Sequence, residues 1–196
     1  KMNTVSDEMR NTIIRKAGEL FSRYGYRKTT MDDIADALQK GKRSIYYYFQ
    51  NKEDIFRAVI EKEAMEAKSA LQKSMEREPT PKDKLRVYLL ERTKEFMQKA
   101  NYYQALHSDY LTNLPFVEHL REKYDKDEVQ VIRQILDEGV KFEQFDVDDT
   151  YSTALIIVNT LKGLEIFFIL DKLDIAEYSV HLNRLTDILL YGITKR

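Results

Sequence analysis

Cysteine is absent from the 196 residues of this chain, and glycine (6) and proline (3) are both scarce. Without cysteine there can be no disulfide framework, no thiolate metal site and no sulfur redox chemistry. The few helix-breaking residues leave long periodic segments, and no segment shows the two-residue alternation of a half-buried strand. We therefore predict an all-α protein.

Long hydrophobic runs are missing as well. No run reaches the roughly 18 apolar residues of a membrane helix, and the first residues lack the charged-then-apolar pattern of a secretory signal. The most apolar stretch, 154–170, is interrupted by Asn159, Lys162, Gly163 and Glu165, which favours a buried helix. We expect a protein that stays in the cytoplasm.

The formal net charge of −1 hides an asymmetry along the chain. Residues 1–60 contain 12 Lys or Arg against 8 Asp or Glu, a net of +4, and the remainder contains 20 against 25, a net of −5. A basic head before an acidic body suits a polyanionic partner, and it suits an ordinary solvated helical domain equally well.

The head begins with two predictable helices. Apolar residues of the first segment recur near a 3.6-residue period up to Gly25, which stands where a helix would end in a left-handed cap. Thr30 and Asp33 have the spacing of a capping box. This spacing predicts a second, short helix that begins near Met31 and ends near Gln39.

Gly41 opens a predicted third helix, in which Ile45 and Phe49 lie four residues apart and face inward together. Residues 51–54 (NKED) form another capping-box pattern, which predicts a fourth helix that runs to about residue 78, before Pro79. Further helices are predicted at about 82–99, 102–112, 116–143 with a possible break near Asp125, 149–170 and 175–193.

The stretch KRSIYYYF crowds positive charge and aromatic rings into the third helix. Helical spacing places Lys42 below Tyr46 and Arg43 below Tyr47 on one outward face, opposite Ile45. Lysine and tyrosine can hold phosphates in a major groove, and arginine can fork onto a guanine edge. Two short helices joined by residues 39–41 indicate a helix-turn-helix, although exposed basic charge is also common on helix pairs that bind no DNA.

A longer sequence pattern is more specific than the helix-turn-helix signal alone. Phe21 before Gly25, followed by TTMDDIA at 29–35, IYYYF at 45–49 and NKEDIF at 51–56, resembles the DNA-binding domain of the tetracycline-repressor (TetR) family of transcriptional regulators. The resemblance covers about residues 10–57. It implies a DNA-binding regulator with an all-helical C-terminal domain that binds a small effector and forms a homodimer on palindromic operator DNA.

The resemblance also implies which side chains touch DNA. Phosphate contacts fall on Thr30, Tyr46 and Lys52, and groove-facing positions fall on Lys42, Arg43, Ser44 and Tyr47. The turn departs from the family pattern, because Gln39, Lys40 and Gly41 stand where a glycine, an apolar residue and a serine or threonine are common. No operator sequence is therefore carried over from other members.

We expect two domains, a DNA-binding domain at 1–58 and an effector-binding and dimerisation domain at 59–196. In the middle of the second domain, aromatic rings with polar tips suit a mostly apolar or aromatic effector, or equally an aromatic core. The candidate ligand-binding residues are Phe96, Tyr103, His107, Tyr110, Phe116 and His119. The histidines lack metal-ligand spacing, and we expect neither a metal nor another cofactor.

The last two predicted helices carry broad apolar stripes that could pair with a second copy in a four-helix bundle, or could serve only the internal core. The candidate interface residues are Val158, Leu161, Phe168, Leu185 and Leu189.

The sequence offers no cysteine nucleophile, glycine-rich phosphate loop or serine elbow, and only three histidines. We therefore expect no enzyme. The favoured hypothesis is a dimeric repressor that a small-molecule effector releases from its operator. The alternative is a helical protein-interaction adaptor without sequence-specific DNA binding.

Overall fold

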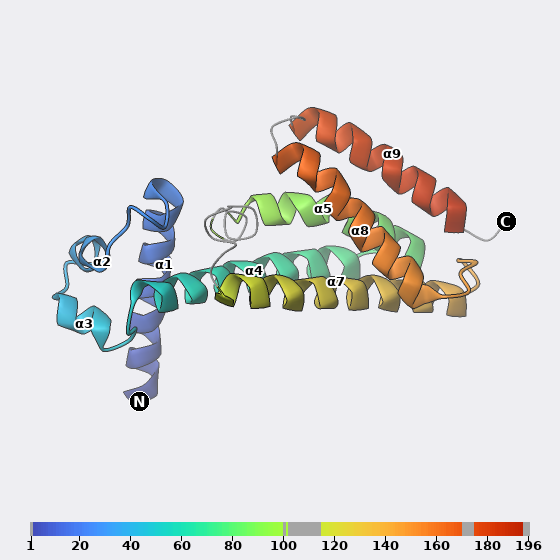
Figure 1. Cartoon of the computed structure of the whole chain (residues 1–196). Coiled ribbons are helices and arrows are strands. Elements are labelled where there is room, and N and C mark those ends of the chain that lie inside the picture. The colour runs from blue at the N-terminus through green and yellow to red at the C-terminus, as the bar shows by residue number, and fades with distance from the viewer. Residues whose placement is uncertain (1, 100, 102–114, 170–174, 194–196) are drawn as a thin grey trace.

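The computed structural model describes residues 2–99, 101, 115–169 and 175–193 (Figure 1). Its helices are α1 (Met2–Tyr24), α2 (Met31–Ala37), α3 (Lys42–Tyr46), α4 (Lys52–Glu76), α5 (Pro81–Met97), α7 (Pro115–Lys141), α8 (Thr150–Ile169) and α9 (Ile175–Ile193). The all-α prediction is confirmed. The break predicted near Asp125 is wrong, because α7 runs through it without interruption. The helix predicted at 102–112 lies outside the described residues.

Local chemistry sets the helix ends in the head. The predicted capping box is present at α2, where the Thr30 hydroxyl accepts from the Asp33 N–H at 3.1 Å and the Asp33 carboxylate accepts from the Thr30 N–H at 2.8 Å. At α4 the Asn51 side chain accepts from the Asp54 N–H at 2.8 Å. Gly25 ends α1 with a φ of +82°, as the sequence predicts.

The head has its own core, which we call the head cluster. Phe21 from α1 and Phe56 from α4 meet edge to face with ring centres 5.1 Å apart, and the Tyr26 ring lies beside both. Ile45 and Phe49, which were expected to face inward, are buried in this cluster. The short helices α2 and α3 are thereby fixed on the frame of α1 and α4.

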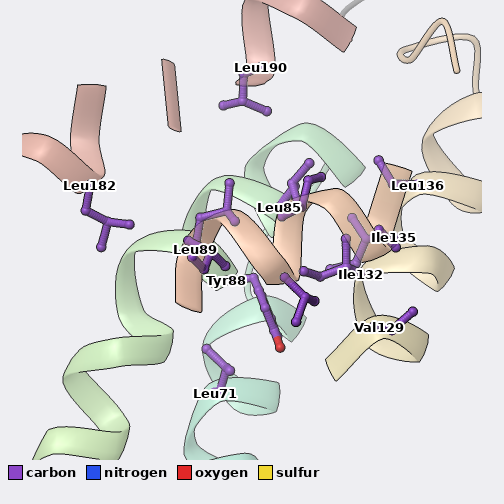
Figure 2. Close-up of a cluster of buried hydrophobic side chains, with 14 of the residues drawn as sticks. Leu71, Leu85, Tyr88, Leu89, Val129, Ile132, Ile135, Leu136, Leu182 and Leu190 are labelled. Atoms are coloured by element: carbon purple, nitrogen blue, oxygen red, sulfur yellow. The ribbon is translucent and has the colours of Figure 1, made fainter. Parts of the chain in front are cut away.

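A second core, the body cluster, draws on five helices. Figure 2 shows Leu71 from α4, Leu85 and Leu89 from α5, Ile132 and Leu136 from α7, and the α9 leucines converging on one space. Helix α8 adds Ala154, Ile157, Val158 and Leu161. In this cluster α5 is the central helix, because it packs against α4, α7 and α9.

Helix α4 links the two clusters. Its first half, up to Ala64, packs in the head cluster, and Leu71 on its second half packs in the body cluster. Figure 1 shows α4 leading from the head, with α1 across its beginning, to the body. Helix α4 is therefore packed against side chains of both clusters. Among the described helices none combines the length and apolar character needed to span a bilayer.

Candidate nucleic-acid interface

The outward face of α3 is aromatic and basic, and its inward face is buried in the head cluster. Ile45 and Phe49 are 0% and 5% exposed, whereas Tyr46 and Tyr47 are 45% and 80% exposed. Tyr48 is partly buried against the head cluster and meets the Tyr47 ring edge to face at 5.0 Å. An exposed tyrosine pair on a rigidly anchored helix offers hydroxyl groups and flat rings to a partner.

The first three residues of α3, Lys42, Arg43 and Ser44, are all exposed. The Lys42 ammonium lies 2.8 Å from the Asp32 carboxylate of α2, and this hydrogen bond raises the pKa of Lys42 above its ordinary value. Arg43 has no ion pair among the residues that the structure describes. The basic face thus carries one paired and one unpaired cation.

Helix α3 is short, at five residues. Its hydrogen-bond pattern nevertheless continues beyond Tyr46, because the Tyr48 and Phe49 N–H groups both donate to the Ile45 carbonyl, at 3.0 and 3.1 Å. The last turn tightens there and carries Phe49 back into the core. The predicted division of inward and outward residues is therefore retained.

The turn between α2 and α3 adopts a glycine-type conformation without glycine. Gln39 has a φ of +52°. The Lys40 N–H donates to the Ala35 carbonyl at 3.0 Å and the Gln39 N–H to the Asp36 carbonyl at 2.9 Å, which is the bonding of a Schellman motif. Gly41 caps α3 with a φ of −64°, a value open to any residue.

The two remaining candidate phosphate contacts already have partners within the protein. The exposed Thr30 hydroxyl donates to the Asp33 carboxylate at 2.7 Å, which lowers the pKa of Asp33. The Lys52 ammonium donates to the Tyr26 carbonyl at 2.8 Å and lies 4.4 Å from the centre of the Tyr26 ring. Burial lowers the pKa of Lys52. One of the three ammonium donors is used in this way, and two remain.

Sequence reasoning missed three residues at this surface. Asp32 pairs with Lys42, Tyr26 holds Lys52, and the Arg10 guanidinium lies 5.1 Å from the centre of the Phe49 ring. Each of these contacts joins two separate elements. No periodicity or local motif could have identified them.

Most of the candidate effector-binding residues, or their side chains, lie outside the part of the chain that the structure describes. Tyr103, His107 and Tyr110 lie outside the described residues. Phe96 and Phe116 belong to α5 and α7, but their side chains are also outside the described part. His119 is exposed on α7. Among the described side chains, no group of three or more His, Asp or Glu is placed to hold a metal ion.

The body does contain a buried polar network. The Arg92 guanidinium binds the Glu128 carboxylate, with Nη2 and Oε2 2.7 Å apart, and the Tyr88 hydroxyl donates to the same carboxylate at 3.4 Å. Burial raises the pKa of Tyr88 well above its ordinary value. The Thr93 and Tyr178 hydroxyls lie 2.8 Å apart. These contacts join α5 to α7 and α5 to α9.

The candidate interface residues lie mainly on the inner faces of α8 and α9. Val158 and Leu161 are each 1% exposed and are core residues of the protomer. Leu185 and Leu189 are half-buried against the body cluster, and the side chain of Phe168 is outside the described part. Among the described side chains, the large apolar ones that α8 and α9 leave exposed are others, namely Tyr151, Leu155, Ile156, Val180, Ile188 and Tyr191.

Comparisons with protein families cover both parts of the chain. The family model described as "Bacterial regulatory proteins, tetR family" matches residues 13–59, which correspond to the head. The model described as "QacR-like protein, C-terminal region" matches residues 77–195, which is more than half of the chain.

Individual relatives agree with the family models. The HTH-type transcriptional regulator QacR of Staphylococcus aureus is 24% identical over 193 residues, which cover 95% of this chain and 99% of QacR. The biofilm operon icaADBC HTH-type negative transcriptional regulator IcaR of Staphylococcus epidermidis is 45% identical over 53 residues, 27% of this chain and 29% of IcaR.

Solved structures share the fold over nearly the whole chain. A transcriptional regulator from Cytophaga hutchinsonii superposes with a TM-score of 0.81 at 27% identity, covering 94% of this chain and 98% of that one. A TetR/AcrR-family regulator from Thermobifida fusca gives 0.71 at 26% identity, covering 94% and 98%. A regulator from Saccharomonospora viridis, solved in complex with choline, gives 0.76 at 20% identity, covering 97% and 100%, and supports the fold alone.

Proposed function

The chain belongs to the TetR family of bacterial regulatory proteins, and from that premise we propose that it is a homodimeric repressor that reads a palindromic operator and leaves it when a small-molecule effector binds the body. The family consists of DNA-binding transcriptional regulators, not enzymes. The single observation that carries the proposal is the anchored α3 with its exposed basic and aromatic face.

In the proposed complex α3 enters the major groove. Arg43 reads a base edge, and Ser44 and Tyr47 lie against the groove. Lys42 and Tyr46 hold backbone phosphates. Arg43 is assigned to a base edge because it is the exposed cation of α3 that has no ion pair in the described part of the chain.

Two further contacts would clamp the flanking phosphates. Thr30 lies at the N-terminus of α2 and Lys52 begins α4, and helix N-termini favour anions. Lys52 can offer its two remaining donors to a phosphate while it keeps its bond to Tyr26. In this arrangement the Tyr26 carbonyl orients the ammonium.

The proposed dimer pairs α8 and α9 with the same helices of a second copy. Ile156 of α8 and Ile188 of α9 are 62% and 63% exposed, and Tyr191 is 80% exposed. Large apolar side chains in such numbers on adjacent helices suit a helix-to-helix interface. A dimer places two recognition helices on two half-sites about 34 Å apart.

The effector is proposed to bind within residues 77–195, the part that matches the QacR-like C-terminal region. Binding there can reach the heads through α4, which packs in both clusters. Coupling of this kind is reciprocal, so operator DNA must weaken effector binding by the factor by which effector weakens DNA binding. A regulator of this kind would act in the cytoplasm, where its DNA lies.

Selection from a random DNA pool tests the proposal. The full chain is expected to enrich a palindrome, and its affinity for that sequence should fall steeply with salt, because phosphate contacts release counterions. An Arg43→Ala variant serves as the matched control and should enrich a different or more degenerate site. A pool that stays random, with binding that salt does not alter, would contradict sequence-specific DNA reading.

A further inference from the structure

A carboxylate lies beside the proposed DNA-reading face. Asp32, in the first turn of α2, places Oδ1 2.8 Å and Oδ2 2.9 Å from Nζ of Lys42, the first residue of α3. The two side chains are 61% and 51% exposed. The ion pair is therefore on the surface that DNA would approach, and it joins the two helices of the helix-turn-helix.

We propose that Asp32 limits the non-specific affinity of this protein for DNA by holding Lys42 away from backbone phosphates. The inference rests on the proposed function, in which α3 faces the DNA. In this account Asp32 sets the ratio of operator affinity to random-DNA affinity, and it makes no attractive contact with DNA itself.

The argument begins with the origin of non-specific binding, which comes almost entirely from cations that neutralise phosphates. Lys42 in its ion pair contributes little net charge to that attraction, because the Asp32 carboxylate holds its ammonium group. Arg43, the adjacent cation, has no ion pair among the described residues, so it stays available to a base edge.

The pair must also be able to open, because Lys42 is expected to serve the operator. Ion pairs between exposed side chains are weak and readily exchange partners. A phosphate held in register by the remaining operator contacts can therefore replace Asp32. On random DNA those contacts are missing, and the pair stays closed. Specificity then comes partly from an element that acts against binding to random DNA.

The experiment compares the full chain with its Asp32→Asn variant on a random-sequence duplex and on the selected operator, over a range of salt concentrations. The variant should bind random DNA several-fold more tightly at low salt. Its slope of log affinity against log salt should steepen by about 0.9 per head, or about 1.8 per dimer, because one more phosphate per head is neutralised. The ratio of operator to random affinity should fall.

Two controls separate this mechanism from general electrostatics. Asp36→Asn makes the same charge change one turn along the exposed face of α2, where the described residues provide no ion pair. It should have a clearly smaller effect. In a Lys42→Gln background, Asp32→Asn should leave the salt slope unchanged, because no lysine remains to be released. A variant that misfolds would lose affinity, so it cannot imitate the expected gain.

The outcomes are distinct. The inference is overturned if Asp32→Asn binds random DNA no better than wild type, if Asp36→Asn matches it, or if its effect persists without Lys42. A wild-type protein that binds the operator while Asp32→Asn behaves identically overturns this inference alone. A wild-type protein with no salt-dependent binding to any duplex overturns the proposed function as well.

Discussion

Gln39 occupies a backbone conformation that costs most side chains free energy. Its φ of +52° lies in the left-handed region, where a Cβ crowds the neighbouring carbonyl. The Schellman bonds at the end of α2 require this conformation, so the strain is held in place by the turn. Gln39 stands where the family commonly has glycine, and this difference should be measurable in the free energy of unfolding.

Replacing Gln39 by glycine should stabilise the protein. We expect the free energy of unfolding to rise by about 0.5–1 kcal/mol, because glycine adopts the left-handed region without a Cβ clash. Urea denaturation at fixed protein concentration measures the change. Gln39→Ala keeps the strain and should remain within about 0.5 kcal/mol of wild type. A glycine variant no more stable than the alanine variant would show that this turn is unstrained.

Arg43 and Tyr46 lie on the same face of α3 but should affect binding differently. Arg43→Ala should cost about 1–3 kcal/mol on the operator and relax the preference at one base pair. Tyr46→Phe, which removes one hydroxyl, should weaken operator and random duplexes by the same factor. Binding to a panel of single-base operator variants distinguishes the two. Equal losses on every sequence from Arg43→Ala would assign that side chain to a phosphate.

At the scale of single elements, the buried pair Arg92–Glu128 links α5 to α7. Glu128→Gln should lower the free energy of unfolding by about 3–5 kcal/mol, because it leaves the buried guanidinium without this carboxylate. Chemical denaturation followed by circular dichroism measures the loss.

The neighbouring residue supplies the control for this pair. Asp127 forms an exposed ion pair with Lys68 of α4 at 3.0 Å, so Asp127→Asn should change the same quantity by no more than about 1 kcal/mol. Similar small losses from both substitutions would mean that the buried pair contributes little to the body.

Element positions were largely predictable because the signals for them are local. The capping residues Thr30 and Asn51 fixed two helix starts, and the spacing of Ile45 and Phe49 fixed the inward side of α3. The break near Asp125 was wrong, since α7 continues through this residue and the Asp125 carboxylate pairs with Lys162 of α8.

Contacts between elements could not be predicted in this way. The pair Asp32–Lys42 spans 10 positions and the bond from Lys52 to Tyr26 spans 26, so each depends on how whole helices pack. The same limit applies to α8. Apolar residues occupy more positions of α8 than one helix face can hold. Only the packed structure separates the core residue Val158 from the exposed Ile156.

At the scale of the whole molecule, the proposed dimer predicts that a charge on the exposed face of α9 separates the subunits. Ile188→Lys places an ammonium in the apolar interface and should raise the dimer dissociation constant by about tenfold or more. Analytical ultracentrifugation measures the change, and circular dichroism checks that helicity is kept.

Met65 provides a matched control for the interface. It is 69% exposed on α4, away from α8 and α9, so Met65→Lys should leave the dimer intact. A monomeric wild type, or an Ile188→Lys variant as dimeric as Met65→Lys, would place the interface elsewhere or remove it.

The most direct test of the central claim, that two heads of one dimer read two half-sites, is the affinity and stoichiometry of the full chain on the selected duplex and on spacing variants. We predict two chains per palindrome, and a loss of affinity of about 100-fold or more when about five base pairs, half a helical turn, are inserted between the half-sites. Equal affinity for the palindrome, the spaced variant and a single half-site, with one chain bound per half-site, would contradict it.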